Sequence, residues 1–293
     1  MAERLAYSPP AISVDVEDWP QSTWDRTLPI TSRSADNTRR LLELLERAGI
    51  RATMFVLGKF AEQFPDIVRE IHSSGHELAC HGYGHLEIFK QTQAEFREDV
   101  RNCKDLLEQA AGTRVVGYRA PDFSIIGNTL WALPILAEEG FVYDSSIFPV
   151  RGRRYGIPCW PRAPLQIMLS DGLSIHELPI ATSRQFGINL PVGGGGYHRL
   201  LPGFLSRYFA QQIMEENPFV FYCHPYEFDA LEFTEIGLKL PLRVRLHQGL
   251  GRAQFTGRFE KFVANFGGQR MIDLLESTTW GKAGLSEVMS GTQ

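Results

Sequence analysis

Residues 77–85 read Glu77-Leu78-Ala79-Cys80-His81-Gly82-Tyr83-Gly84-His85 and are the most informative segment of the chain. A short apolar run leads into two histidines that stand four residues apart. On a helix this spacing would place both rings on one face, but Gly82 and Gly84 would each cost a helix roughly 1 kcal/mol. The stretch therefore predicts a strand that ends at Cys80 and a turn in which His81 and His85 converge. Neutral imidazole is a common metal ligand, although solvent-exposed loop histidines would give the same pattern.

An acidic cluster follows the first predicted strand. In the run Ser13-Val14-Asp15-Val16-Glu17-Asp18 the two-residue period of a strand places Ser13, Asp15 and Glu17 on one side. Isolated charges are expensive to bury, so several carboxylates at one strand end are hard to explain as packing. The alternative is a helix cap or a solvated turn, which Pro20 would permit. One of these carboxylates, together with two histidines, would complete a metal site that keeps an open position.

Composition limits the classes of function. The chain has 293 residues, of which 43% are hydrophobic, and its net charge is −4. One large domain or two small ones are therefore possible, and no basic stripe indicates a nucleic-acid partner. No apolar run is long enough for a membrane span, and the first residues lack the apolar core of a signal peptide. The four cysteines show no paired spacing, and a cytoplasmic location is expected.

Strand-like and helix-like segments alternate through the first half of the chain. Strands are expected at 11–16, 52–56, 77–80, 115–119 and 141–143, and helices at 34–48, 60–74, 91–111 and 129–139. This alternation predicts parallel strands joined by crossover helices. It favours a barrel-like α/β fold, in which chemistry takes place where strands end and loops begin.

The second half is less regular. We expect a long loop at 151–164, a strand at 173–180, a helix at 201–216 and an apolar strand at 219–223 that ends at His224. The four glycines at 193–196 lack the Lys-Ser/Thr pair of a phosphate-binding loop. A flexible or close-packed loop beside the substrate is expected there instead. From residue 259 the tail is expected to add an outer helix and no strand.

The predicted strand ends together offer the parts of an amide hydrolase. His81, His85 and one carboxylate would hold a divalent metal, and this mixed nitrogen and oxygen set suits zinc, cobalt or nickel. Asp15 would act as general base, and Arg119 would hold it ionised and oriented.

Two further groups complete this hypothesis. The backbone N–H of Asp122, just beyond Pro121, would help to stabilise an oxyanion. His224 would protonate a leaving amine. A lone histidine after an apolar strand is more often structural, but here it falls at the end where the other groups gather.

The ordered motifs at 13–18, 81–85, 119–121 (Arg-Ala-Pro) and 224–225 (His-Pro) resemble the polysaccharide deacetylases (carbohydrate esterase family 4, the NodB homology domain). The resemblance implies an α/β fold, a distorted (β/α)7 barrel at 11–230, with a C-terminal extension at 231–293 packed on it. It also implies the use of a divalent metal, zinc first, to remove N-acetyl or O-acetyl groups from sugars. The roles carried over are base for Asp15, metal ligands for His81 and His85 with one acid, base orientation for Arg119, and acid for His224.

Departures from the family pattern leave two positions open. The usual adjacent aspartates are replaced, so either Glu17 or Asp18 is the expected metal ligand. Asp122 stands where tyrosine is usual, and its carboxylate would be unhelpful beside an oxyanion unless it turns away or binds an amino sugar. With Pro121 and Tyr197 it is expected to contact the substrate.

The glycine run with Tyr197 looks like the subgroup linked to bacterial exopolysaccharide and O-antigen clusters. The expected partner is an acetylated sugar or a polysaccharide precursor, linked to a nucleotide or a lipid, and an oligomer is possible. Two alternatives keep the fold. One is a cyclic amide hydrolase of the allantoinase or imidase kind, and the other is a non-catalytic sugar-binding relative.

Overall fold

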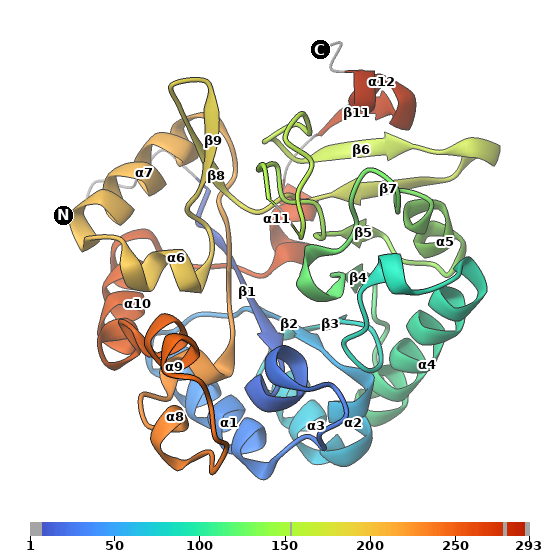
Figure 1. Cartoon of the computed structure of the whole chain (residues 1–293). Coiled ribbons are helices and arrows are strands. Elements are labelled where there is room, and N and C mark those ends of the chain that lie inside the picture. The colour runs from blue at the N-terminus through green and yellow to red at the C-terminus, as the bar shows by residue number, and fades with distance from the viewer. Residues whose placement is uncertain (1–7, 153, 278–279, 291–293) are drawn as a thin grey trace.

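The computed structural model describes residues 8–152, 154–277 and 280–290. Residues 1–7, which were expected to lack the apolar core of a signal peptide, lie outside the described residues. A nine-stranded sheet has the strand order β10-β1-β2-β3-β4-β5-β7-β6-β11 (Figure 1). The first seven strands in this order are parallel neighbours. They are β10 (Val220–Cys223), β1 (Ala11–Val16), β2 (Thr53–Val56), β3 (Glu77–Cys80), β4 (Gly117–Tyr118), β5 (Tyr143–Asp144) and β7 (Ser174–Glu177). β6 (Leu165–Met168) is antiparallel to β7, and β11 (Gly281–Gly284) is parallel to β6.

The parallel strands form a distorted barrel. Beyond β7 the chain crosses to β10, where the Ala181 N–H donates to the Val220 carbonyl at 3.1 Å. On the same strand, the Tyr222 N–H donates to the Gly193 carbonyl at 2.8 Å. These backbone bonds, instead of a strand ladder, link the two ends of the parallel set. The predicted α/β fold with parallel strands is confirmed.

Helices cover the outside of the first half and follow one another along the lower and right-hand rim in Figure 1. They are α1 (Ser32–Arg47), α2 (Gly58–Gln63), α3 (Pro65–Ser73), α4 (Gln93–Ala111) and α5 (Ala132–Glu138). The single helix predicted at 60–74 was wrong, because Pro65 has no N–H to continue α2 and instead opens α3. α4 begins at a reciprocal cap between Thr92 and Glu95 and ends at Gly112, whose φ is 68°.

The second half adds a hairpin of β8 (Thr182–Gln185) and β9 (Ile188–Pro191). Its helices are α6 (Gly195–Leu200), α7 (Gly203–Glu216), α8 (Glu232–Glu235), α9 (Leu242–Gly249), α10 (Arg252–Phe266), α11 (Met271–Ser277) and α12 (Leu285–Ser290). The tail predicted to lack strands was wrong, since β11 pairs with β6. The glycine run is not simply a loop either, because its last two residues open α6. Among the described residues, no helix combines the length and the apolar character needed to cross a membrane.

The barrel is closed at the amino ends of its strands. The α11 backbone docks there: the Met271 N–H donates to Thr53 Oγ1 at 2.8 Å, and the Ile272 N–H donates to Glu77 Oε2 at 3.0 Å. Met271 and Leu274 are buried in an apolar cluster with Phe55 of β2. The carboxyl ends of β1, β3, β4 and β10 meet at the opposite end of the barrel. The cleft described below opens there.

Candidate active site

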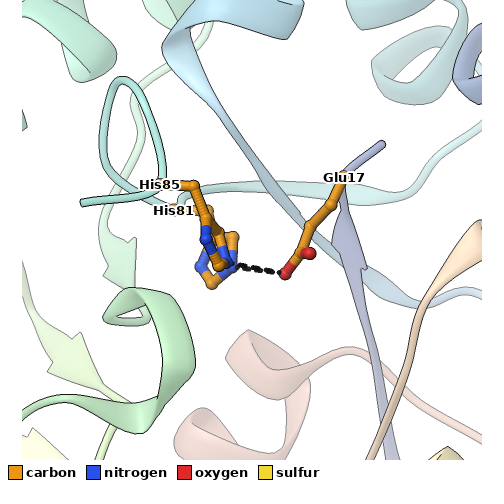
Figure 2. Close-up of side chains that lie close together, drawn as sticks. All are labelled: Glu17, His81 and His85. Carbon is orange, nitrogen blue, oxygen red and sulfur yellow. Dashed lines mark hydrogen bonds and ion pairs between the residues drawn. The ribbon is translucent and has the colours of Figure 1, made fainter. Parts of the chain in front are cut away.

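Two histidines and one glutamate converge at the carboxyl ends of β1 and β3. Figure 2 shows both rings turned toward the Glu17 carboxylate. Glu17 Oε1 lies 3.1 Å from Nε2 of His81 and 3.1 Å from Nε2 of His85. All three side chains are buried. The sequence expectation that His81 and His85 meet an acid from the first strand therefore matches the geometry.

The turn after β3 brings the two rings together. Gly82 has a φ of 73°, which glycine adopts without steric cost. His85 has a φ of 61°, an uncommon conformation for a side chain of its size and one that clusters at functional sites. The Tyr83 N–H donates to Asp99 Oδ2 of α4 at 3.0 Å, which fixes the middle of the turn.

The donor set fits a divalent cation. His81 Nδ1–H donates to the Arg119 carbonyl at 2.8 Å, so a neutral ring presents a bare Nε2 to a carboxylate oxygen. Two acceptors would then face each other, and a cation between them relieves the conflict. Ligand atoms about 2.0–2.1 Å from a tetrahedral ion lie about 3.3 Å apart, close to the 3.1 Å seen here.

The electrostatics of this cluster favour added positive charge. If protons on the two rings take the place of a cation, burial still opposes ionisation of Glu17, but the charges of His85 and His224 and hydrogen bonds from His81 and His85 hold its pKa well below the usual value. Conversely, burial lowers the pKa of His85, and the Glu17 carboxylate outweighs it, so the net shift is upward. We call Glu17, His81 and His85 the triad from here on. The nature of the metal, zinc or otherwise, stays a prediction.

The structure separates the two acids between which the sequence left the choice open. Asp18 turns away from the histidines, and its Oδ2 accepts from the Thr31 N–H at 2.6 Å, just before α1. Burial raises the Asp18 pKa to about 6, against hydrogen bonds from Thr31 that lower it. The geometry favours Glu17 for the metal and argues against Asp18 as a second ligand. Asp18 instead holds the residue from which α1 begins.

Asp15 and Arg119 form a buried ion pair beside the triad. Arg119 Nη1 donates to Asp15 Oδ1 at 2.6 Å and to Ser13 Oγ at 2.9 Å. The rest of the guanidinium is held by Ser145, whose carbonyl accepts from Nε and whose hydroxyl accepts from Nη2. Its carbon also lies 4.1 Å from the centre of the Phe55 ring. Arg119 is therefore locked in one orientation toward Asp15.

His224 faces the same space from the end of β10. Its Nε2 lies 3.7 Å from Glu17 Oε1 and 4.0 Å from Asp15 Oδ2. Its Nδ1 lies 3.2 Å from Glu227 Oε2, and its ring stacks on Tyr226 at 4.6 Å. Burial lowers the pKa of His224, but the charges of Glu17 and Glu227 outweigh it and raise the pKa to about 9.

Glu227 was not assigned a role from the sequence. It is buried, and Nε of Arg199 in α6 lies 3.6 Å from its Oε1. The start of α6 lies so close that a Cβ at Gly195 would be 2.2 Å from Glu227 Oε2. The glycine run is thus close-packed at this position, as one of its two sequence interpretations expected. The signal that could have found Glu227 is its i+3 spacing from His224 in a turn opened by Pro225.

Asp122 occupies the turn after β4 with a φ of 54°. Its carboxylate is engaged by Arg26 Nη2 at 3.0 Å and by Arg154 Nη2 at 2.8 Å. Two arginines thus neutralise the negative charge of Asp122, which was expected from the sequence to be unfavourable beside an oxyanion. Pro121 opens this turn and fixes its entry, and it is not among the residues that line the cleft.

A cleft of about 400 Å³ joins these groups. It is lined by Asp15, Glu17, His85, Asp122, Tyr197 and His224, together with residues that the sequence did not single out for it, notably Tyr155, Arg199, Tyr222 and His247. The Tyr197 hydroxyl lies 2.9 Å from that of Tyr155. Burial raises the Tyr197 pKa, so this phenol stays neutral and can donate a hydrogen bond. The cleft is therefore lined by both aromatic and ionisable side chains.

Comparisons with known proteins point to one family. Residues 17–136 match the model described as polysaccharide deacetylase, and residues 145–276 match a domain of unknown function, DUF3473. A peptidoglycan deacetylase-like protein of Gibberella zeae is 36% identical over 37% of this chain and 32% of its own. A peptidoglycan-N-acetylglucosamine deacetylase of Bacillus cereus is 34% identical over 32% and 35%. The chain spans about a third of the length of these curated relatives.

Solved structures agree on the fold. A protein of Mycobacterium smegmatis named for the same family superposes with a TM-score of 0.60, at 22% identity, over 94% of each chain. An allantoinase superposes with a TM-score of 0.53, at 15% identity, over 96% of this chain and 89% of its own. At these identities the likeness concerns the fold alone.

Proposed function

The chain belongs to the polysaccharide deacetylase family, and we propose that it is a metal-dependent hydrolase that removes an N-acetyl group from an acetamido sugar. The observation that carries this proposal is the meeting of the triad with Asp15 and His224 in one cleft. A cation site, a base and an acid within a few ångströms are the parts that amide hydrolysis needs.

The residues divide the work of the reaction. A bound divalent ion, held by the triad, would polarise the acetyl carbonyl and lower the pKa of a water. Asp15, held in place by Arg119, takes a proton from the attacking water as its oxygen bonds to the carbonyl carbon. His224, kept protonated by Glu227, then gives a proton to the sugar nitrogen as the carbon–nitrogen bond breaks. The products are acetate and a free amino sugar.

The substrate class is a finer step of the same proposal. Tyr155, Tyr197 and Tyr226 line the cleft and can pack against the apolar face of a sugar ring. The polar side chains of the same cleft would fix the orientation of that ring. The Bacillus cereus relative is named as a deacetylase of N-acetylglucosamine in peptidoglycan, which supports an acetylated amino sugar as the substrate. A surface polysaccharide or its precursor is the proposed substrate. The cytoplasmic location and the division of the chain at residue 230 stay predictions.

The test is acetate release from N-acetylglucosamine oligosaccharides by the purified, metal-loaded chain. We expect release by the native protein and a loss of about 10²-fold or more in Asp15→Asn. The matched control is Asp25→Asn, which changes an exposed aspartate whose carboxylate accepts hydrogen bonds from Thr27. Turnover of allantoin or hydantoin without acetate release would favour the cyclic amide hydrolase. Sugar binding without turnover of any acetylated substrate would favour the non-catalytic relative.

A further inference from the structure

Helix α9 (orange in Figure 1) carries large apolar side chains that are exposed to solvent. Leu242 and Leu246 of this helix are 70% and 62% exposed, and Leu250, which follows it, is 64% exposed. The two helical leucines are four residues apart and therefore share one face. Clustered exposed apolar side chains mark interaction sites far more often than single ones do.

The same segment is basic within an acidic chain. Residues 236–250 contain Lys239, Arg243 and Arg245 and no aspartate or glutamate, whereas the whole chain has a net charge of −4. All three cations are exposed, and within the part of the chain that the structure describes none has an acidic partner at ion-pair distance. The preceding acid, Glu235, is already paired with Arg33 at 3.0 Å. We name Lys239, Leu242, Arg243, Arg245, Leu246 and Leu250 the α9 surface.

The α9 surface borders the mouth of the catalytic cleft. His247 and Gln248 of α9 line the cleft together with Leu200, which is itself 48% exposed. Arg199 donates to the Gln248 carbonyl and, at 3.0 Å, to the Leu250 carbonyl. This buried arginine therefore fixes the carboxyl end of α9 beside the cleft.

We propose that the α9 surface docks on a bilayer of anionic lipids. Leucines on one face of a short helix can enter the boundary between headgroups and acyl chains, while flanking arginines and a lysine contact anionic headgroups. A second copy of this chain fits less well, because a symmetric interface centred on α9 would set its cations against each other. Docking would present the cleft mouth to the bilayer, and it does not depend on the chemistry proposed for the cleft.

The test is co-sedimentation of the full chain with vesicles of phosphatidylglycerol mixed with phosphatidylcholine. Vesicles of phosphatidylcholine alone serve as the neutral comparison. We expect binding to the anionic vesicles, weakened at high salt. Leu242→Ser with Leu246→Ser should weaken binding at least about tenfold. Arg243→Gln with Arg245→Gln should weaken it about fivefold for each arginine.

The control variant changes Phe186 and Ile188 to serine in the β8–β9 hairpin, where they are 102% and 61% exposed. It should bind as the native chain does. Thermal unfolding of each variant checks that it is folded, and exposed positions should leave the midpoint nearly unchanged. The proposal is overturned if the native chain ignores anionic vesicles, or if the leucine pair can be replaced without loss of binding. It is also overturned if the native chain is a dimer that the leucine variant dissociates while neither binds vesicles.

Discussion

Nη1 of Arg119 lies 2.6 Å from Oδ1 of Asp15, and both side chains are buried at the carboxyl ends of β4 and β1. The same guanidinium is fixed by Ser13, by Ser145 and by the Phe55 ring. The guanidinium of Arg119 is planar and is held by several hydrogen bonds, so it fixes the Asp15 carboxylate in a single orientation. A flexible ammonium group would not do so. The proposed base is thus held in place by Arg119, which is itself fixed by side chains of β1, of β2 and of the residue after β5 before any substrate arrives.

Arg119→Lys should therefore impair catalysis although it keeps the charge. Lysine cannot bond Asp15 and Ser145 at the same time, so one buried partner is left unsatisfied. We expect turnover to fall at least about tenfold and the free energy of unfolding to fall by about 1–3 kcal/mol. The matched control is Arg33→Lys, which changes an arginine paired with Asp229 outside the cleft and should leave turnover unchanged. A fully active Arg119→Lys would mean that orientation of Asp15 is unimportant.

Replacement of Glu17 and of Asp18 should have different consequences. Glu17→Gln should lose bound metal on dialysis, because its oxygen faces both imidazoles. Asp18→Asn should keep the metal and lose about 1 kcal/mol of stability, because it weakens the hydrogen bond from Thr31 before α1. Elemental analysis and thermal unfolding measure the two effects. Metal loss in Asp18→Asn with retention in Glu17→Gln would reverse the assignment.

The alkaline limb of the activity profile should report His224. The acid must be protonated, and its pKa is raised to about 9 by Glu17 and Glu227 against burial. A metal on Glu17 offsets one of these charges, so the limb should lie at or below about pH 9. Glu227→Gln removes the other charge and should move the limb down by about one unit or more. The measurement is kcat/KM across the neutral and alkaline range, and a limb that stays in place in Glu227→Gln would exclude His224 as the acid.

Acid sensitivity of the fold should trace in part to His198. Burial lowers its pKa from the usual 6.5 to about 4, because its ring packs against Phe221 and Phe262. A folded pKa below the unfolded one means that the stabilisation is complete above pH 6.5 and is lost as the pH falls through about 4. His198→Leu should flatten the loss of unfolding free energy in this window by up to about 3 kcal/mol.

The control for that experiment is His72→Leu on α3, where the ring is exposed to solvent. It should leave the pH dependence of unfolding unchanged. Chemical denaturation at a series of pH values gives the slopes directly. An unchanged slope in His198→Leu would show that other buried groups cause the acid sensitivity.

Asp122→Asn should preserve most of the turnover. The Asp122 carboxylate bonds Arg26 and Arg154, and its backbone conformation tolerates asparagine as well as aspartate. We expect turnover within about threefold of the native rate and a larger change in KM, because the released Arg154 lines the cleft. If turnover instead fell by about a hundredfold or more, the Asp122 carboxylate would belong to the chemical step.

Local sequence patterns were sufficient for the groups carried at strand ends. Asp15, His81, Arg119 and His224 each directly follow or end an apolar strand, and parallel strands bring such ends together. Local pattern could not decide whether Glu17 or Asp18 binds the metal. The decision depends on Thr31, 13 residues further along the chain, whose N–H donates a hydrogen bond to Asp18. Arg199 was missed for the same reason, since its role depends on the way α6 packs against β10.

The tail was the weakest part of the sequence prediction. β11 is short, carries two glycines and pairs with β6 at the end of the strand order, and it has no apolar alternation to reveal it. The docking of α11 against Thr53 and Glu77 is likewise a tertiary effect, in which a helix start supplies N–H donors to buried side-chain oxygens. Such contacts follow from the closure of the barrel and not from any periodicity in residues 271–277.

The proposed function requires that the triad holds a metal without which the cleft cannot hydrolyse an acetamide. The most direct measurement is acetate release by chelated protein during titration with zinc, with Glu17→Gln run in parallel. We expect no release without metal, recovery that saturates at equimolar zinc, and no recovery in Glu17→Gln. Undiminished release by fully chelated protein, or full recovery in Glu17→Gln, would show that the triad metal is not needed for hydrolysis.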